Sequence, residues 1–360
     1  MPLFRGLALA SLLLAALFAT TSAAVVPEPV RSTKDTWVRH FPERHRGESV
    51  ALGPDGGAWI GVSTQAGGAE LGRARAGRLS LQKLGESENG ATTIGLQFDP
   101  QGNLWFLKNE EAGAAIMRRA PDGTLTEFKP PRIRREANDL VLAPDGSLWF
   151  TRSNFKAGGT VGRLIPTTGA ITEYPAGTFG PGSMAIGPDG AIWFSDPRSG
   201  RIGRSTTDGV VQQFPLPTGI EPRQIVAGPD GAIWFSENGK PGPHRSLHDR
   251  IGRITTDGVV TQFPIPFGGG TLALAPDPRG FVWFTTSYGQ LSSISPAGVI
   301  GGSGCPAGCA ASIVAIAVGP SKAVWFAKAT QDCGGCGGGA EIVAQNEGTA
   351  VGKVRGGEIG

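Results

Sequence analysis

Side chains that could bind a ligand or a cation recur at two positions, both counted from a tryptophan. Three residues after successive tryptophans stand Val62, Lys108, Arg152, Asp196, Glu237, Thr286 and Lys328. Near the start of the apolar segment that precedes each tryptophan stand Glu48, Ile94, Asn138, Gly182, Arg223, Gly270 and Val314. If the two segments are antiparallel strands, both sets lie at the same end of them. We therefore expect both sets at the mouth of one channel.

These side chains predict a binding cup of mixed charge. The expected polar arc contains Lys108, Asn138, Arg152, Asp196, Arg223 and Glu237, and it faces a small and apolar arc from the last two repeats. Arg152 or Arg223 could hold a carboxylate, and Glu237 with Asp196 could hold a metal cation. The alternative is that these groups are solvated and paired with one another. No acid and base pair is recognisable, so no catalytic residue is assigned.

The histidines that could act as bases fall in connecting segments. His244 and His248 lie in the insertion 238–249, just after two prolines, and we expect them in a surface loop. His45 has the same interpretation, and His40 is expected in an outer strand.

The cysteines form two short motifs, Cys305 with Cys309 and Cys333 with Cys336. In an exported chain, four cysteines predict two disulfides, and the sequence leaves their pairing open. A zinc site made of the four thiolates is the alternative.

The elements that must position these residues are repeats. The seven tryptophans that head them are 46, 44, 44, 41, 49 and 42 residues apart: Trp59, Trp105, Trp149, Trp193, Trp234, Trp283 and Trp325. Self-similarity at this period, with four strands in each unit, is typical of a β-propeller. We predict an all-β fold, a seven-bladed propeller of four-stranded antiparallel blades.

One repeat illustrates the expected blade. Strands are predicted at 224–227, 232–236, 250–255 and 260–265, with a tight turn at Gly228-Pro229-Asp230-Gly231. Gly252 inside the third strand indicates a close approach by another group. We expect the tryptophan of the neighbouring blade over this glycine, and Arg253 over the ring. The repeated tryptophans and the repeated arginines then have a structural role.

The two ends of the chain predict how the ring closes. The segment 38–42 matches the outer strands, and 351–353 matches a third strand with no outer strand after it. The N-terminal strand should therefore complete the last blade. The expected organisation is a signal peptide at 1–24, a flexible linker at 25–35, the propeller at 36–355 and a loose tail at 356–360.

Composition and the N-terminal segment predict where the protein works. Arg5, the apolar run 7–18 and the small residues Ala23 and Ala24 indicate a secretory signal cleaved near Ala23 or Ala24. No later apolar run is long enough to span a membrane. The formal net charge is only +3, which does not favour a nucleic-acid partner. We expect a secreted monomer, extracellular or periplasmic, that binds a small molecule or peptide.

The motifs GPDGAIWFS around Trp234, IGRI at 251–254 and VTQFP at 260–264 carry a family resemblance. In this combination the chain is similar to the streptogramin B lyase (virginiamycin B lyase) family of seven-bladed propellers. The resemblance extends over about residues 36–354 and is strongest over 146–266. It implies an elimination that opens a cyclic depsipeptide at its ester, with a histidine base and Mg²⁺ in support.

The matching positions of this chain lack those groups. The family's two histidines correspond to Gly270 and Val314, and the glutamate before the second corresponds to Ser312. Two pocket aromatics of the family correspond to Ser287, which is followed by Tyr288, and to Glu48. The motif that survives runs from Glu221 to Ile225 and has Arg223 in the histidine position, where a guanidinium is a poor base.

Three functions follow from the sequence. The first is an exported binding or scaffold propeller with its ligand at the channel mouth, where Glu221 and Tyr288 join the two charged sets. The second is a lyase with a rearranged site that uses His244 or His248 and a metal held by Glu237. The third is a platform for protein interactions on the loops of the fifth and seventh blades.

Overall fold

The computed structural model describes residues 37–40, 45–64, 68–75, 78–84, 91–111, 113–131, 137–154, 156, 158–217, 220–239, 249–266, 270–304, 311–319, 324–330 and 340–345. In several strand residues, mostly towards the two ends of the chain, only the backbone is described. These ranges contain strands and no helix, so they hold no helix long and apolar enough to cross a membrane.

Six antiparallel sheets are each made of four strands that follow one another in the chain. Blade one contains β2 (His45–Leu52), β3 (Ala58–Thr64), β4 (Ala69–Arg75) and β5 (Arg78–Lys83). Blade two contains β6 (Thr92–Phe98), β7 (Leu104–Glu110), β8 (Gly113–Arg119) and β9 (Leu125–Phe128). Blade three contains β10 (Ala137–Leu142), β11 (Leu148–Arg152), β12 (Thr160–Ile165) and β13 (Ala170–Pro175).

Blades four to six follow the same order. Blade four contains β14 (Met184–Ile186), β15 (Ile192–Asp196), β16 (Arg201–Ser205) and β17 (Val211–Pro215). Blade five contains β18 (Ile220–Ala227), β19 (Ile233–Gly239), β20 (Arg250–Ile254) and β21 (Val260–Pro264). Blade six contains β22 (Thr271–Asp277), β23 (Phe281–Thr286), β24 (Leu291–Ile294) and β25 (Ile300–Gly304). The all-β propeller predicted from the repeat is therefore present.

The two ends of the chain share one further sheet, called here the terminal sheet. It contains β26 (Ala311–Val318), β27 (Val324–Thr330), β28 (Ala340–Gln345) and β1 (Trp37–His40), in the order β1-β28-β27-β26. β1 is antiparallel to β28, so the predicted pairing of the N-terminal strand with the last repeat is confirmed. The strand beside β1 is β28, whereas the predicted one, 351–353, lies outside the described residues.

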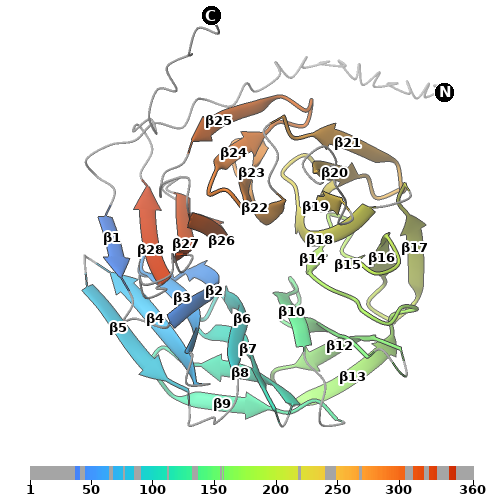
Figure 1. The fold of residues 1–360 in the computed structure, drawn as a ribbon. Coiled ribbons are helices and arrows are strands. Elements are labelled where there is room, and N and C mark those ends of the chain that lie inside the picture. The colour runs from blue at the N-terminus through green and yellow to red at the C-terminus, as the bar shows by residue number, and fades with distance from the viewer. Residues whose placement is uncertain are drawn as a thin grey trace, which may run out of the picture.

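The blades stand in a ring with their first strands towards the centre (Figure 1). β26 of the terminal sheet lies against β22 of blade six on one side and β2 of blade one on the other. The innermost strands, which precede each tryptophan, therefore face the axis, and the outer strands form the rim. This arrangement puts the first of the two charged sets closest to the centre.

A repeated polar contact, complete in blades four and five and present at least in part in blades one, two, three and six, stabilises the turns, and we call it the Trp–Asp–Arg layer. The indole N–H of the second-strand tryptophan donates to the aspartate of the preceding turn in Trp105 and Asp99, Trp193 and Asp189, Trp234 and Asp230, and Trp283 and Asp277. A third-strand arginine binds the same aspartate in Arg73 and Asp55, Arg163 and Asp145, Arg204 and Asp189, and Arg253 and Asp230. The layer is thus built from the residues that make the sequence repeat.

The arginines of this layer also cover indole rings, but the ring belongs to the same blade and not to the neighbouring one that the sequence predicted. The guanidinium carbon lies 5.3 Å from the ring centroid for Arg73 over Trp59 and 5.5 Å for Arg163 over Trp149. Burial alone would raise the pKa of Asp230, but hydrogen bonds from Trp234 and Arg253 hold that pKa below its ordinary value.

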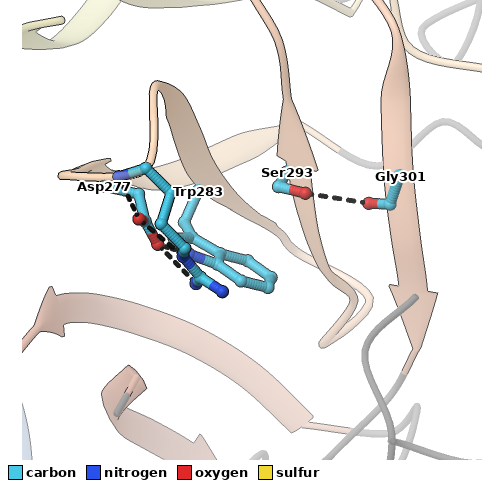
Figure 2. A network of polar contacts seen from close by, with 5 residues as sticks. Asp277, Trp283, Ser293 and Gly301 are labelled. Carbon is cyan, nitrogen blue, oxygen red and sulfur yellow. Dashed lines mark hydrogen bonds and ion pairs between the residues drawn. The ribbon is translucent and has the colours of Figure 1, made fainter. Parts of the chain in front are cut away.

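Blade six keeps the layer with a different arginine. Ser293 stands opposite Trp283, where blades one to five have arginine, and its hydroxyl donates to Gly301 O at 3.3 Å (Figure 2). Arg279, from the turn itself, supplies the guanidinium instead, with Nη2 2.7 Å from Asp277 Oδ2. The carboxylate and the indole therefore keep their geometry although the repeat is broken.

The glycine of the third strand has a different neighbour from the one predicted. A β-carbon on Gly203 would overlap the ring of Phe194, and one on Gly252 would overlap Phe235. Each phenylalanine directly follows the tryptophan of the same blade and stands opposite the glycine across the strand pair. The expectation of a tryptophan from the neighbouring blade is wrong, because a ring on the adjacent strand already fills the space over the glycine.

Candidate functional site

A cavity of about 800 Å³ occupies the centre of the ring. Its lining comes from the innermost strands β2, β6, β10, β18, β22 and β26, and from β14 with the segment before it. Blades four and five contribute most, because the segments 180–184 and 221–226 both line it. Of the binding residues predicted for the channel mouth, Asn138, Glu221 and Arg223 belong to this lining.

Irregular strand pairing marks the same level of the ring in most blades. The register between the first and second strands shifts at Glu48, at Asn138, at Arg223 with Gln224, at Leu272 with Ala273, and at Val314. Bulges bend a strand and redirect its side chains, and they are common beside functional sites. Glu48, Asn138, Arg223 and Val314 of the first set thus lie in a ring of bulges around the cavity.

The register corrects one member of that set. Pro222 pairs with Glu237 just before the bulge of blade five, and Thr271 pairs with Thr286 just before that of blade six. The residue equivalent to Arg223 is therefore Leu272 and not Gly270. The sequence comparison gave the turn of blade six two extra residues, which moved the expected position to Gly270. In the structure, the number of residues from the bulge to the tryptophan is the same in blades five and six.

The cavity wall has two chemically different sides. The charged side chains of the described lining all come from blades three to five: Asp139, Arg198, Glu221 and Arg223. Blades one, two and six and the terminal sheet contribute mainly apolar side chains: Val50, Ile94, Leu96, Leu272, Val314 and Ile316. Apolar residues such as Val141 and Ile225 also line the charged side. Of the predicted polar arc, only Asn138 and Arg223 belong to the described lining.

Arg223 and Glu221 form the charged feature of the wall. Arg223 Nη2 lies 2.9 Å from Glu221 Oε2, and the arginine side chain is 55% exposed. The Ser195 hydroxyl of blade four donates to Arg223 O at 2.7 Å and so fixes the arginine backbone. The guanidinium is therefore presented from a rigid strand while remaining open to solvent.

Asn138 lies at the equivalent bulge of blade three. Its Nδ2 donates to Ser153 Oγ and to Pro181 O, both at 2.6 Å. The amide thereby joins two connecting segments at the mouth of the cavity. Its role in the structure is to position the wall, and its carbonyl remains the group available for a ligand.

Asp139 and Gln224, which the sequence reasoning missed, connect the blades directly behind the wall. Asp139 Oδ2 accepts from Ser183 Oγ and from the backbone N–H of Met184, both at 2.8 Å. Gln224 Oε1 accepts from the N–H of Leu274 in blade six at 2.6 Å. Burial raises the pKa of Asp139, although these hydrogen bonds oppose that shift. The sequence signal that could have identified these two residues is a polar side chain ten positions before the tryptophan of the blade.

The second charged set lies elsewhere. Side chains of a second strand stand perpendicular to the blade, so they lie between neighbouring blades and not in the channel. Arg152 is 1% exposed and binds Glu173 of the outer strand and Pro131 O. Lys108 binds Glu110 at 2.6 Å. Neither belongs to the described lining of the central cavity.

The two acidic members of that set are also buried within the blades. Both oxygens of Glu237 accept hydrogen bonds from Gln262 Nε2, at 2.9 and 2.8 Å, and burial raises the pKa of Glu237 to about 7. Asp196 accepts from the hydroxyl of Thr178 at 2.5 Å. Among the described residues, no three His, Cys, Asp or Glu side chains gather as a metal site would require. The cation site proposed for Glu237 with Asp196 therefore gains no further ligand from these residues.

A second hollow, of about 730 Å³, lies between blades three and four. Its wall includes Glu173, Thr160 and Phe179. The segment before β14 separates the two hollows, because Thr178 and Phe179 line this one while Gly180 to Ser183 line the central cavity.

The remaining predicted site residues have separate positions. Tyr288 is 57% exposed in the β23–β24 connection and is not in the described cavity lining. Glu48 lies at the bulge of β2, where only the backbone is described. His244, His248 and the four cysteines lie outside the described residues, as does the segment 1–36.

Comparison with known proteins identifies the family. A profile of the Virginiamycin B lyase family matches residues 40–334. The chain belongs to this family. Among solved structures, the streptogramin B lyase structure has a TM-score of 0.70 at 24% identity, covering 86% of this chain and 98% of the other. No curated protein matches the sequence.

Two further solved structures are similar to this chain. A catalytically inactive His-to-Ala virginiamycin B lyase from Staphylococcus aureus, crystallised with quinupristin, has a TM-score of 0.70 at 24% identity, covering 86% of this chain and 99% of that one. YCF48 bound to D1 peptide has a TM-score of 0.63 at 12% identity, covering 89% and 99%. At these identities the likeness establishes the fold alone.

Proposed function

We propose that this member of the Virginiamycin B lyase family is a binding protein whose site is the central cavity. The observation that carries the proposal is the wall of that cavity, which combines apolar side chains such as Leu272 and Ile316 with charged side chains such as Arg223. A hollow of about 800 Å³ with a few polar groups among apolar ones is the usual form of a small-molecule site.

The wall supports binding better than elimination. An elimination needs a base within reach of the proton that it removes. The resemblance matches the family's histidines to Gly270 and Val314, and the residue of blade six at the level of Arg223 is Leu272; none of these three residues has a side chain that takes up a proton. The described lining contains no histidine.

A neutral apolar dye tests the proposal. We expect Nile red to bind one site per chain with enhanced fluorescence, because the apolar arc excludes water from the dye. Leu272→Glu and Val314→Glu should abolish the enhancement. Val210→Glu is the control, since Val210 is 64% exposed on the turn before β17 and is not in the cavity wall. Equal loss in the control, or none in the cavity variants, would overturn the proposal.

Family membership keeps the lyase as a second candidate, and quinupristin with Mg²⁺ separates the two. Elimination breaks the ester C–O bond and removes a neighbouring proton without adding water, so its product is an isomer of unchanged mass with a free carboxylate. A binding protein leaves quinupristin unchanged under liquid chromatography and mass spectrometry. Formation of the isomer, and its loss in His244→Ala or His248→Ala, would favour the lyase.

We also propose the finer features expected from the sequence. The terminal sheet serves as the seventh blade, which its contacts with β22 and β2 support. The protein is exported as a monomer after cleavage near Ala23 or Ala24, with Cys305, Cys309, Cys333 and Cys336 in two disulfides. N-terminal sequencing of the secreted protein, light scattering and a free-thiol assay under denaturing conditions test these points. Four titratable thiols would refute the disulfides.

A further inference from the structure

Two arginines were candidates for binding a ligand carboxylate, and the structure separates them. Arg152 is almost fully buried and already binds Glu173 and Pro131 O, outside the described cavity wall. Arg223 lines the cavity and more than half of its side chain is exposed. Only Arg223 is therefore placed to meet a ligand in the central cavity.

The guanidinium of Arg223 retains donors for such a ligand. Nη2 binds Glu221, while Nε and Nη1 have no partner among the described residues. An exposed ion pair of this kind contributes little and yields readily to a competing anion. The N–H pairs of a guanidinium that match the two oxygens of a carboxylate are Nη1 with Nη2 and Nε with Nη2, so a ligand carboxylate competes with Glu221 for Nη2.

The charges around the cavity also favour an anion. The wall carries Arg198 and Arg223 against Glu221 and Asp139. Asp139 accepts backbone N–H groups of Met184 and Leu140 as well as the Ser183 hydroxyl, so its charge is compensated behind the wall. With Asp139 compensated, the remaining charged groups of the described lining are Arg198, Arg223 and Glu221, which leaves a positive balance at the mouth.

The apolar side of the wall determines the rest of the ligand. β22 and the terminal-sheet strand β26 follow β18 around the ring, and they present Leu272, Val314 and Ile316 to the same cavity. A group bound at Arg223 that points across the cavity meets these side chains. Its body must therefore be apolar to replace water there favourably.

We propose, on the basis of the binding function above, that the ligand is an amphipathic carboxylate. Its carboxylate binds Nη1 and Nη2 of Arg223 in competition with Glu221, and its apolar body lies against Leu272, Val314 and Ile316.

Displacement of Nile red by three ten-carbon probes tests this assignment. Decanoate, decanol and decylammonium share an alkyl chain and differ in charge, and each is used below its micelle-forming concentration. We expect decanoate to displace the dye at the lowest concentration and decylammonium at the highest. Arg223→Gln should weaken decanoate about tenfold, as the loss of a charge-assisted hydrogen bond does, and leave decanol unchanged.

Three more variants make the result specific. Glu221→Gln should strengthen decanoate binding, because it removes the anion that competes for Arg223. Arg223→Lys should retain part of the preference, since it keeps the charge without the planar fork. Arg201→Gln, at an exposed arginine of β16 outside the described wall, is the matched control and should change nothing. Thermal denaturation checks that each variant is folded.

The outcomes separate this inference from the proposed function. If decanol and decylammonium displace the dye as well as decanoate does, or if Arg223→Gln weakens all three equally, the carboxylate assignment is wrong and the binding site stands. If neither Nile red nor any probe binds, the proposed function fails first.

Discussion

Two rings of side chains run through the same blades, and they differ in how closely they repeat. The Trp–Asp–Arg layer recurs with the same residue types in most of the six blades, and blade six rebuilds it with Arg279 where the third-strand arginine is absent. The bulge ring around the cavity holds a different residue type in almost every blade, from Asn138 to Arg223 to Leu272. Turn stability requires the same contact in every blade, whereas a binding wall requires different groups on different sides.

This difference predicts that the two rings separate stability from binding. The layer is buried between blades and its loss leaves a cavity, while the exposed side chains of the bulge ring can change without loss of packing.

Removing a tryptophan of the layer should have the largest effect. Trp234 is fully buried, stacks on Phe263 at 5.7 Å and donates to Asp230. We expect Trp234→Ala to lower the free energy of unfolding by about 3–5 kcal/mol, measured by chemical denaturation. Arg223→Ala is the comparison and should change it by less than about 0.5 kcal/mol. A similar loss in both variants would contradict the separation.

The next effect depends on pH and concerns Glu237. Burial raises its pKa from 4.5 to about 7 in the folded protein. Between these values the folded state holds a proton that the unfolded state has lost, so this contribution is complete below pH 4.5 and is lost as the pH rises towards 7. The whole contribution is about 3 kcal/mol for a fully buried group.

Glu237→Gln makes this measurable, because the amide keeps the shape of the protonated acid. The variant should match the wild type near pH 4 and exceed its free energy of unfolding at pH 8 by up to about 3 kcal/mol. Arg250 lies near enough to favour the charged form of Glu237, which reduces the difference in unfolding free energy between the variant and the wild type. A variant that is less stable than the wild type at both pH values would show that the carboxylate is needed in its charged form.

A smaller effect is expected at the third-strand glycine. A β-carbon on Gly203 would overlap Phe194, so Gly203→Ala should displace the ring and cost about 1–3 kcal/mol in unfolding free energy. Gln212→Ala, on the exposed face of β17, serves as the control. No loss at Gly203 would mean that the ring can move without cost.

The sequence predicted the layer well and the cavity wall only in part, for a physical reason. Trp234 and Arg253 belong to a motif that recurs in successive blades, so the period could be predicted, whereas the ring that the arginine covers was assigned to the wrong blade. The position of Arg152 depends on which way a side chain leaves the second strand, and spacing from the tryptophan does not reveal this. Leu272 was missed because the turn of blade six looks longer than it is once the strands pair.

Blade six offers the finest test of the layer, because there the arginine has moved. Arg279→Ser should lower the free energy of unfolding by about 1 kcal/mol, since Asp277 loses its ion pair while Trp283 still donates to it. Adding Ser293→Arg places a guanidinium opposite Trp283, the position that Arg253 has in blade five. The double variant should recover most of the loss in chemical denaturation. If it does not, the layer depends on the turn of each blade, and a third-strand arginine is not interchangeable with one from the turn.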